Sequence, residues 1–224
     1  MTTARRDLLK TLADELAGRR QAWPLRVAID GPTAAGKTTL ADELAECLVD
    51  RNPVIRAGLD GFHRPRALRY ERGRRSAVGY YEDARDYAAM RRELLDPLGP
   101  EGDRRFRRAI FDLDSDAVID AEVETAAHGA ILIVDGTFLQ RAEFDRAWDV
   151  VVFLDVDPAT SLSRGAARDA EAMGGLDAAI ALYQERYLGA WRLYVEKVGP
   201  VERADIVISH NDPSSPVLIR SIER

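Results

Sequence analysis

The segment Gly31-Pro-Thr-Ala-Ala-Gly-Lys-Thr38 constrains the fold of this chain more than any other feature. It matches the pattern G-x-x-x-x-G-K-[ST], follows the apolar strand pattern of residues 25–29 and opens a helical pattern over residues 37–49. In such a loop, glycines let backbone N–H groups turn towards phosphate oxygens, and the helix N-terminus adds partial positive charge. The pattern therefore predicts a strand, a phosphate-binding loop and a helix in succession, and binding of ATP or GTP.

Nine consecutive residues of this loop are candidate nucleotide contacts: Gly31, Pro32, Thr33, Ala34, Ala35, Gly36, Lys37, Thr38 and Thr39. A lysine at this place in the motif bridges the β- and γ-phosphates, and the hydroxyl that follows it binds Mg²⁺. Lys37 is also one of only three lysines among 32 basic residues, so its place in the motif stands out.

Short apolar runs typical of buried strands alternate with amphipathic helical patterns along the chain. The runs cover residues 27–29, 54–55, 131–134, 150–154 and 206–208, and the main helical patterns cover 5–17, 40–48 and 176–198. This alternation indicates a mostly parallel sheet with helices on both faces. We expect a three-layer α/β sandwich of the P-loop NTPase type, formed by residues 1–224 as one domain that begins with a helix within residues 1–18.

Carboxylates follow two of the predicted strands. Asp60 comes shortly after the run at 54–55, and Asp135 directly follows the run at 131–134. In an open α/β sheet the chemistry collects beyond the carboxyl ends of the strands. We therefore interpret Asp135 as a carboxylate on the Mg²⁺ side and Asp60 as a general base. The alternative for each acid is a helix cap or a solvated turn.

Composition excludes several other classes of protein. A net charge of -6 argues against a dedicated nucleic-acid binder. The sequence has no apolar run near the ~20 residues that a membrane span needs, and its first residues lack the apolar core of an export signal. The single cysteine, Cys47, excludes an internal disulfide framework and a multi-thiolate zinc site. We expect a cytoplasmic protein with no membrane or nucleic-acid partner.

Three further groups of residues have two interpretations each. The six arginines within residues 64–75 favour a solvated loop over a site for an anionic acceptor such as a sugar phosphate. The shared helix face of Tyr187, Trp191 and Tyr194 favours a core position over base stacking. His63, three residues after Asp60, is equally a structural residue or a contact to an acceptor.

Several segments together resemble uridine kinases, over about residues 25–212. They are the phosphate loop, Asp60-Gly-Phe-His63, the acidic stretch Tyr80–Tyr87, the strand Ile110-Phe-Asp112, Asp135-Gly136, and the arginines Arg164 and Arg168. Uridine kinases belong to the P-loop kinases, alongside phosphoribulokinase, pantothenate kinase and nicotinamide riboside kinase. The order of these segments along the chain is as specific as any one of them.

The resemblance implies a Mg·ATP-dependent transfer of the γ-phosphoryl group to a hydroxyl of a small molecule, by default a uridine- or cytidine-like nucleoside. It implies Asp60 as the base, an acceptor-binding region over about residues 60–116, and Asp83 or Asp86 near the sugar. It also implies that Arg164 and Arg168 lie in a lid over about residues 158–176 that closes on the ATP phosphates. Relatives of this kind often form dimers or tetramers, which makes a homo-oligomer an expectation.

The part of the pattern that recognises a nucleoside differs in this sequence. Phe111 fits the aromatic position, whereas Asp116 stands where a histidine would fall. The Asp60–His63 segment resembles pantothenate kinases and sugar kinases as closely as it resembles uridine kinases. Pantothenate, nicotinamide riboside and a sugar are therefore alternative acceptors, and a P-loop ATPase or switch without an acceptor is an alternative function. A GTPase switch is disfavoured because the sequence lacks an Asn-Lys-x-Asp guanine motif.

Overall fold

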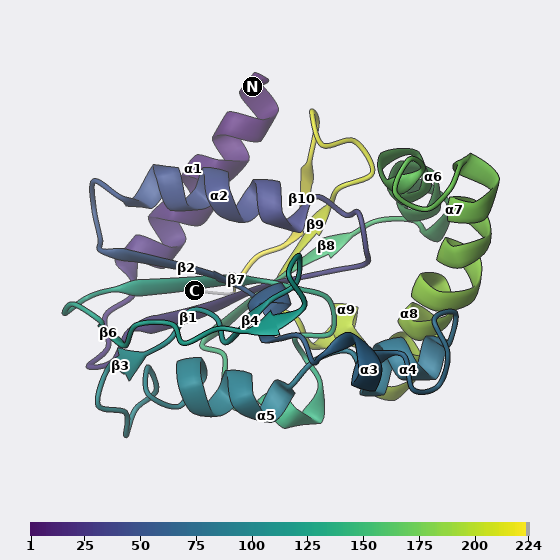
Figure 1. Cartoon of the computed structure of the whole chain (residues 1–224). Helices are drawn as coiled ribbons and strands as arrows, with labels where there is room; N and C mark the ends of the chain where they lie inside the picture. The colour runs from purple at the N-terminus through teal and green to yellow at the C-terminus, as the bar shows by residue number, and fades with distance from the viewer. Residues whose placement is uncertain (223–224) are drawn as a thin grey trace.

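A six-stranded sheet forms the centre of the computed structural model, which describes residues 1–222 (Figure 1). In sheet order the strands are β10 (Val217–Arg220), β9 (Ile206–Ser209), β8 (Val150–Asp155), β1 (Leu25–Asp30), β7 (Ile131–Asp135) and β2 (Val54–Gly58). All neighbouring strands are parallel except β10, which pairs antiparallel with β9. The predicted α/β architecture with a mostly parallel sheet is confirmed.

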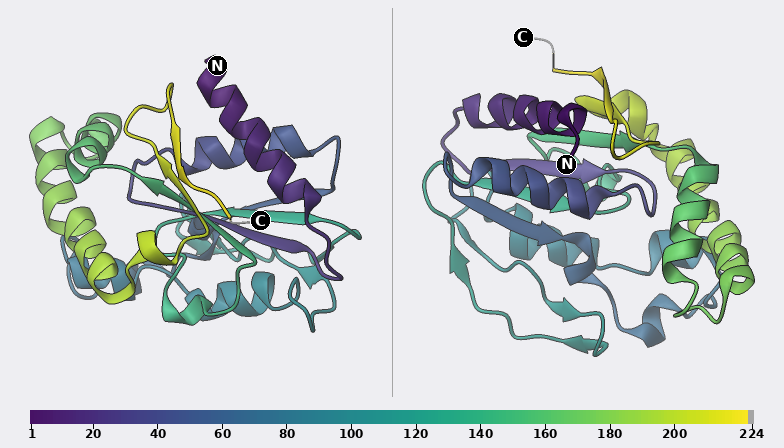
Figure 2. Two further views of the ribbon diagram at one scale, coloured as in Figure 1. Left: turned by 180° about the vertical axis from the view of Figure 1, so that it is seen from behind. Right: turned by 90° about the horizontal axis from the view of Figure 1, so that it is seen from above.

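Helices α1 (Thr3–Gly18) and α2 (Lys37–Leu48) cover one face of the sheet (Figure 2). Their leucines pack against alternate side chains of the central strands, among them Val27, Ile29 and Ile133, all of which are fully buried. Successive side chains of a strand point to opposite faces, so these residues supply one layer of core and their neighbours supply the other.

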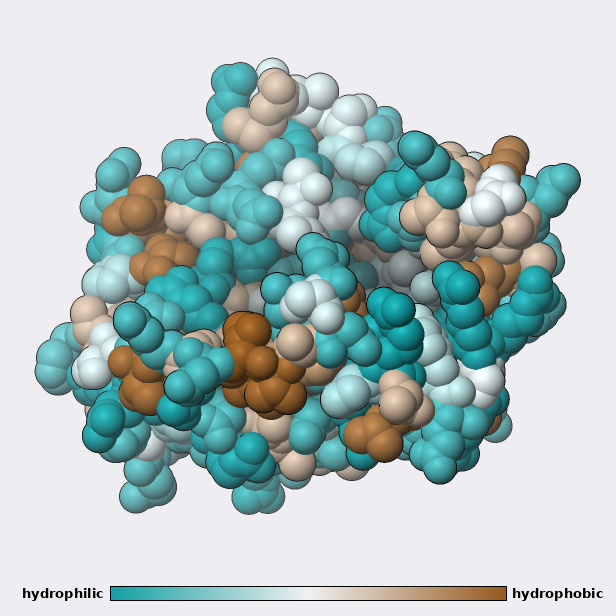
Figure 3. Space-filling model, viewed as in Figure 1, coloured by the Kyte–Doolittle hydropathy of each residue, from teal (hydrophilic) through white to brown (hydrophobic). Residues whose placement is uncertain are grey.

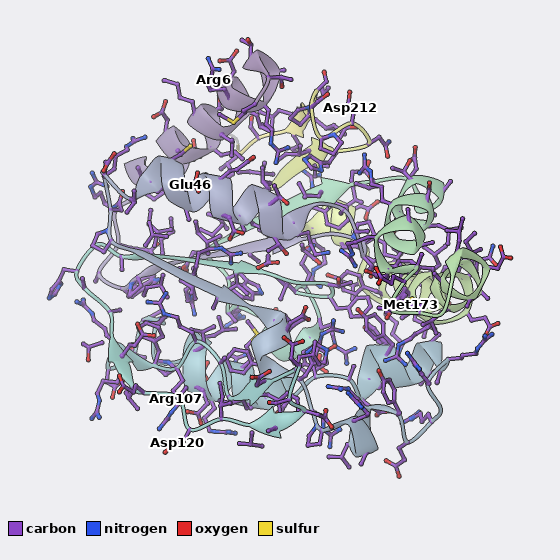
Figure 4. The ribbon with its side chains drawn as sticks, turned by 45° about the horizontal axis from the view of Figure 1, so that its top comes forward. Arg6, Glu46, Arg107, Asp120, Met173 and Asp212 are labelled. Atoms are coloured by element: carbon purple, nitrogen blue, oxygen red, sulfur yellow. The ribbon has the colours of Figure 1, made fainter. Side chains whose placement is uncertain are left out.

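The opposite face is covered by α5 (Tyr87–Met90), the π-helical turn η2 (Arg91–Leu95) and the short helix η3 (Ala142–Phe144). Met90 and Leu94 pack there with Ala28, Leu132 and Val134 of the central strands. In Figure 4, Arg6 and Glu46 lie on the α1–α2 side of the molecule, whereas Arg107 and Asp120 lie on the other side. The predicted three layers are therefore present.

A helical unit stands beside the sheet, at the right of Figure 1. It contains α6 (Pro158–Asp169), α7 (Leu176–Leu182), the π-helical turn η4 (Tyr183–Tyr187) and α8 (Leu188–Val198), followed by α9 (Pro200–Arg203). Helix α4 (Ala77–Glu82) packs on α8 through Tyr80, Tyr81 and Tyr194. The helical pattern of residues 176–198 is confirmed, with one π-helical turn inside it, and it ends at Gly199, whose φ is +60°.

The strand predicted at residues 110–112 is present, and it lies outside the main sheet. β4 (Phe111–Asp112) pairs only with β5 (Ala117–Val118), and β3 (Arg105–Phe106) pairs only with β6 (Glu124–Thr125). The two apolar residues before Asp112 are too few for a strand that must be buried on both faces. Two short helices, η1 (Leu59–Phe62) and α3 (Arg66–Arg69), follow β2. Within residues 1–222, every helix is too short or too polar to cross a lipid bilayer.

Candidate active site

A cavity of about 790 Å³ opens beyond the carboxyl ends of β1, β2 and β7. Its walls are the phosphate loop, the residues after β2 and β7, the region of α3, and the helical unit α6–α8. The space-filling view shows the surface hollowed beside these helices (Figure 3). The cavity therefore lies where an open α/β sheet places its ligands.

The phosphate loop lies against the rest of the sheet at two glycines. Gly31 has a φ of +149°, and a Cβ there would lie 2.8 Å from the carbonyl oxygen of Leu154. Gly36 caps α2 with a φ of +89°, and a Cβ there would lie 3.0 Å from Cε1 of His210. The sequence needs glycine at both ends of the loop because its backbone curves tightly against β8 and the residues after β9.

Asp30, which sequence reasoning missed, anchors the start of the loop. It is fully buried and accepts hydrogen bonds from Gly31 N (2.8 Å), Gln140 Nε2 (3.1 Å) and Tyr194 Oη (2.5 Å). Burial raises the pKa of Asp30, and these hydrogen bonds lower it in part. The sequence did contain a signal, an acid at the end of an apolar strand and directly before the motif. The predicted strand ended at residue 29, one residue before Asp30.

Lys37 points back into the loop. Its Nζ donates to the carbonyl oxygen of Pro32 over 2.7 Å, and its side chain is buried. Burial lowers its pKa to about 8, while Asp30, Asp135 and Asp60 pull the pKa in the opposite direction. The lysine is therefore a poorly solvated cation in an enclosed loop, as a phosphate-binding site requires.

Thr38 and Asp135, the two residues expected on the Mg²⁺ side, meet at the first turn of α2. Thr38 Oγ1 donates to Asp135 Oδ2 over 2.5 Å, and Arg56 Nη2 donates to Asp135 Oδ1 over 2.9 Å. Hydroxyl and carboxylate oxygens are the ligands that Mg²⁺ prefers. Residues 1–222 contain no group of three or more His, Cys, Asp or Glu side chains that could hold a metal, so protein ligands would complete only part of its shell.

Asp60 lines the same cavity as Lys37. Its side chain is 70% exposed, and Oδ1 lies 3.4 Å from Nη2 of Arg85. Partial burial raises the pKa of Asp60, but the charge and hydrogen bond of Arg85, together with the charge of Lys37, outweigh it and hold the pKa below its ordinary value. Asp60 is therefore an accessible, ionised carboxylate facing the phosphate loop.

Arg85 and His63 support this carboxylate. Arg85 is buried and also donates to Tyr80 Oη over 3.0 Å. His63 lines the cavity with Nδ1 3.0 Å from the carbonyl oxygen of Asp60. Burial, together with the charge of Arg85, lowers the pKa of His63 to about 4. His63 is therefore neutral at neutral pH and does not add a positive charge to the wall.

Of the two arginines expected in the lid, only Arg168 lines the cavity. Arg168 Nε donates to Asp169 Oδ1 over 2.7 Å, and Tyr183 Oη donates to Asp169 Oδ2 over 2.6 Å. Arg164 instead donates to the carbonyl oxygens of His210 (3.1 Å) and Asn211. The structure therefore does not bring Arg164 to the cavity beside Arg168.

Three residues expected near the acceptor also lie outside the cavity lining. Asp83 pairs with Arg72 (2.9 Å), and Asp86 caps α5 by accepting from Ala89 N over 2.8 Å. Phe111 is buried, 5.9 Å from the guanidinium carbon of Arg69 to its ring centroid. These three side chains therefore help to hold the acceptor region together but do not line the cavity.

Asp116, in the place of a histidine, neutralises an arginine of the cavity wall. It accepts from Arg69 Nη2 at 2.9 Å and from the backbone N of Arg66 at 3.1 Å. Arg66 and Arg69 both line the cavity, but Arg66 is exposed and Arg69 is buried, so the interpretation of residues 64–75 as a solvated loop was wrong for Arg69. Tyr187 of η4 is half-buried: it packs against the cluster that contains Tyr80 and Tyr194, as expected of a core position, and it also lines the cavity.

A second cavity of about 560 Å³ adjoins the other side of the phosphate loop. It is lined by the N-terminus of α1, by Gly36 and Thr39, and by the residues after β9. Arg5 of α1 crosses this region, with Nη1 3.0 Å from His210 Nε2 and 2.7 Å from the carbonyl oxygen of Pro213. His210 Nδ1 in turn lies 2.7 Å from the carbonyl oxygen of Ala35 in the loop.

Several solved kinases have a similar fold. A possible uridine kinase from Bacillus stearothermophilus has a TM-score of 0.71 at 24% identity, covering 90% of this chain and 97% of its own. A candidate fructose transport system kinase from Silicibacter sp. has a TM-score of 0.69 at 26% identity, covering 85% of this chain and 94% of its own. D-glycerate 3-kinase from Cryptococcus neoformans has a TM-score of 0.61 at 13% identity, covering 86% of this chain and 89% of its own.

No curated protein matches the sequence significantly. The AAA domain family matches residues 27–179, a range that contains the phosphate loop, Asp60, Asp135 and Arg168. The fold is that of the P-loop kinases, related to uridine kinase and other small-molecule kinases, and it implies nucleotide binding. The chain therefore belongs to the AAA domain family, as a P-loop protein with a kinase-like fold.

Proposed function

We propose that this protein is an ATP-dependent small-molecule kinase that transfers the γ-phosphoryl group to a hydroxyl. The observation that carries the proposal is the exposed, ionised carboxylate of Asp60 in the same cavity as Lys37. A P-loop ATPase also needs a group that orients the attacking water, but it does not need an acceptor-sized space beside that group. The 790 Å³ cavity has room for an acceptor beside the phosphates.

In this reaction the acceptor oxygen forms a bond to the γ-phosphorus while the bond between that phosphorus and the β-phosphate oxygen of ADP breaks. Asp60 accepts the proton of the attacking hydroxyl. Lys37 and Arg168 would hold the phosphate oxygens as charge shifts towards ADP. Mg²⁺ held by Thr38 and Asp135 would neutralise phosphate charge when bound. The second cavity, beside Gly36 and Thr39, would receive the adenine base.

A uridine- or cytidine-like nucleoside is the first acceptor to test, followed by pantothenate, nicotinamide riboside and sugars. The test is ADP release from Mg·ATP with each acceptor, compared with no acceptor and with Lys37→Ala. We expect one acceptor to stimulate ADP release and Lys37→Ala to abolish it. Release that no acceptor stimulates would favour the alternative of an ATPase without an acceptor and would reject the kinase.

A further inference from the structure

The lining of the active-site cavity carries more positive charge than a nucleotide uses. Seven lysine and arginine side chains line it, against three aspartates. Under the proposed function, Lys37 and Arg168 bind the phosphates of ATP. Arg56 is neutralised by Asp42 at 2.8 Å and Asp135 at 2.9 Å.

At the acceptor end, Arg69 is neutralised by Asp116. Three cations, Arg66, Arg85 and Arg186, remain there against the single carboxylate of Asp60. This excess lies on the wall that an acceptor would touch.

Arg85 and Arg186 form the core of this excess. Their guanidinium carbons lie 4.7 Å and 4.8 Å from the ring centroid of Tyr80, so both stand against one aromatic ring. Their relative exposures are 5% and 4%, which leaves little water to solvate them. Two buried like charges repel each other, and burial together with this repulsion lowers the pKa of Arg186.

Neither guanidinium is fully paired within residues 1–222. Arg186 has no carboxylate oxygen within 4.0 Å, and its Nη1 donates only to the carbonyl oxygen of Arg74. Arg85 uses only Nη2, which contacts Asp60 at 3.4 Å and Tyr80 Oη at 3.0 Å, while its Nε and Nη1 have no hydrogen-bond partner. Buried cations whose donors are only partly satisfied are unfavourable, so a wall of this kind indicates an anion that binds there.

We propose that the acceptor carries an acid group, a carboxylate or a phosphate monoester, which binds at Arg85 and Arg186 beside Tyr80. The proposal rests on the proposed function, since it assigns the substrate class of the same site. The contact between Asp60 and Arg85 places the acid group next to the general base, so the acceptor hydroxyl lies only a few bonds from it. Arginine suits this role because its planar group binds carboxylate or phosphate oxygens in pairs.

The first test measures anion binding without knowledge of the acceptor. The protein is saturated with Mg²⁺ and a non-hydrolysable ATP analogue, so that the phosphate loop is filled, and is then titrated with inorganic phosphate, acetate or glycerol while thermal unfolding is followed. We expect phosphate or acetate to raise the melting temperature further and glycerol to leave it unchanged. The anion that raises the melting temperature more shows whether the acid group is a phosphate or a carboxylate.

Arg186→Gln should weaken this anion binding at least about tenfold, because it removes a charge-assisted hydrogen bond. The matched control is Arg75→Gln, an exposed arginine outside the cavity that pairs with Glu185 and should bind the anion normally. A normal response of Arg186→Gln to the ATP analogue shows that the variant is folded. No anion-dependent shift in the parent protein, or equal binding by Arg186→Gln, would overturn the proposal.

The second test compares acceptors in pairs that differ by the acid group. The pairs are pantothenate and the analogue with an alcohol in place of its carboxylate, fructose 6-phosphate and fructose, and the uridine monophosphates and uridine. We expect kcat/KM to be at least about tenfold higher for the charged member of the productive pair. Equal or faster turnover of a neutral member would reject the acid group and leave the kinase standing. ADP release that no member stimulates would instead reject the kinase itself, whatever the anion titration shows.

Discussion

The hydroxyl of Thr38 donates to Asp135 Oδ2 over 2.5 Å, which joins the first turn of α2 to the carboxyl end of β7. These two residues lie 97 positions apart in the sequence, and the parallel pairing of β1 with β7 brings them together. The contact places two oxygen ligands for a divalent cation beside the phosphate loop.

Removing the Thr38 hydroxyl should therefore weaken magnesium binding. Thr38→Val keeps the shape of the side chain but deletes one oxygen ligand, and we expect the Mg²⁺ concentration for half-maximal activity to rise by about 10- to 100-fold. Initial rates over a series of free Mg²⁺ concentrations measure this. Thr11→Val, on the exposed side of α1, is the control and should behave like the parent protein. An unchanged Mg²⁺ requirement would remove Thr38 from the metal site.

Asp60→Asn should slow the chemical step and leave nucleotide binding nearly unchanged. We expect kcat to fall by about 10²- to 10⁴-fold, because the amide does not accept the proton of the acceptor hydroxyl, while KM for ATP stays nearly unchanged. Steady-state kinetics with the productive acceptor provide both values. Asp120→Asn, at an exposed acid outside the cavity lining, should match the parent protein. Full activity of Asp60→Asn would show that another group is the base.

Nucleotide binding should take up a proton in mildly alkaline solution. The pKa of Lys37 is about 8 in the free protein, so at pH 8.5 much of its side chain is neutral. Phosphate oxygens favour the charged form and raise this pKa, so binding must add a proton and affinity must fall as the pH rises above 8.

Isothermal titration calorimetry in buffers of different ionisation enthalpy measures this uptake directly. The parent protein should show a heat that depends on the buffer at pH 8.5 and much less so at pH 6.5, where Lys37 is already charged. In Lys37→Met the uptake should disappear. A heat independent of the buffer at pH 8.5 would contradict the assigned state of the lysine.

Gly165→Ala should destabilise the helical unit beside the cavity. A Cβ at Gly165 would lie 2.1 Å from Cε1 of Tyr183, whose ring is fully buried against α6. Overpacking of this kind costs about 1–3 kcal/mol, which urea unfolding resolves. Gly18→Ala, where no atom lies within 4 Å of the new Cβ, should leave stability nearly unchanged. Equal stability of the two variants would mean that α6 moves freely relative to Tyr183.

Local sequence predicted the parts of the fold that repeat a simple pattern. The five parallel strands and the phosphate loop follow from apolar runs and one motif, because a buried parallel strand needs continuous apolar residues. The edge strand β10 (Val217–Arg220) was not predicted, since its side chains are mostly exposed and its antiparallel pairing depends on β9. The strand expected at 110–112 forms outside the main sheet, because two apolar residues are too few for a strand buried on both faces.

The candidate site was predictable where chemistry is fixed by position along one strand or loop, as for Lys37, Thr38, Asp60 and Asp135. Arg85 and Arg186 come from segments about 100 positions apart and meet only on the ring of Tyr80, so no local pattern joins them. Asp83 and Asp86, three positions apart, were acids of the right type, but turn geometry directs them to Arg72 and to a helix cap.

The contacts from Arg5 through His210 to Ala35 hold the start of α1 beside the phosphate loop. Met1 and Thr2 line the second cavity, next to Gly36 and Thr39. An affinity tag fused ahead of Met1 would therefore emerge at the mouth of the space assigned to adenine and could compete with the nucleotide for it. Purified material for binding measurements should have that tag cleaved, or carry it at the opposite terminus.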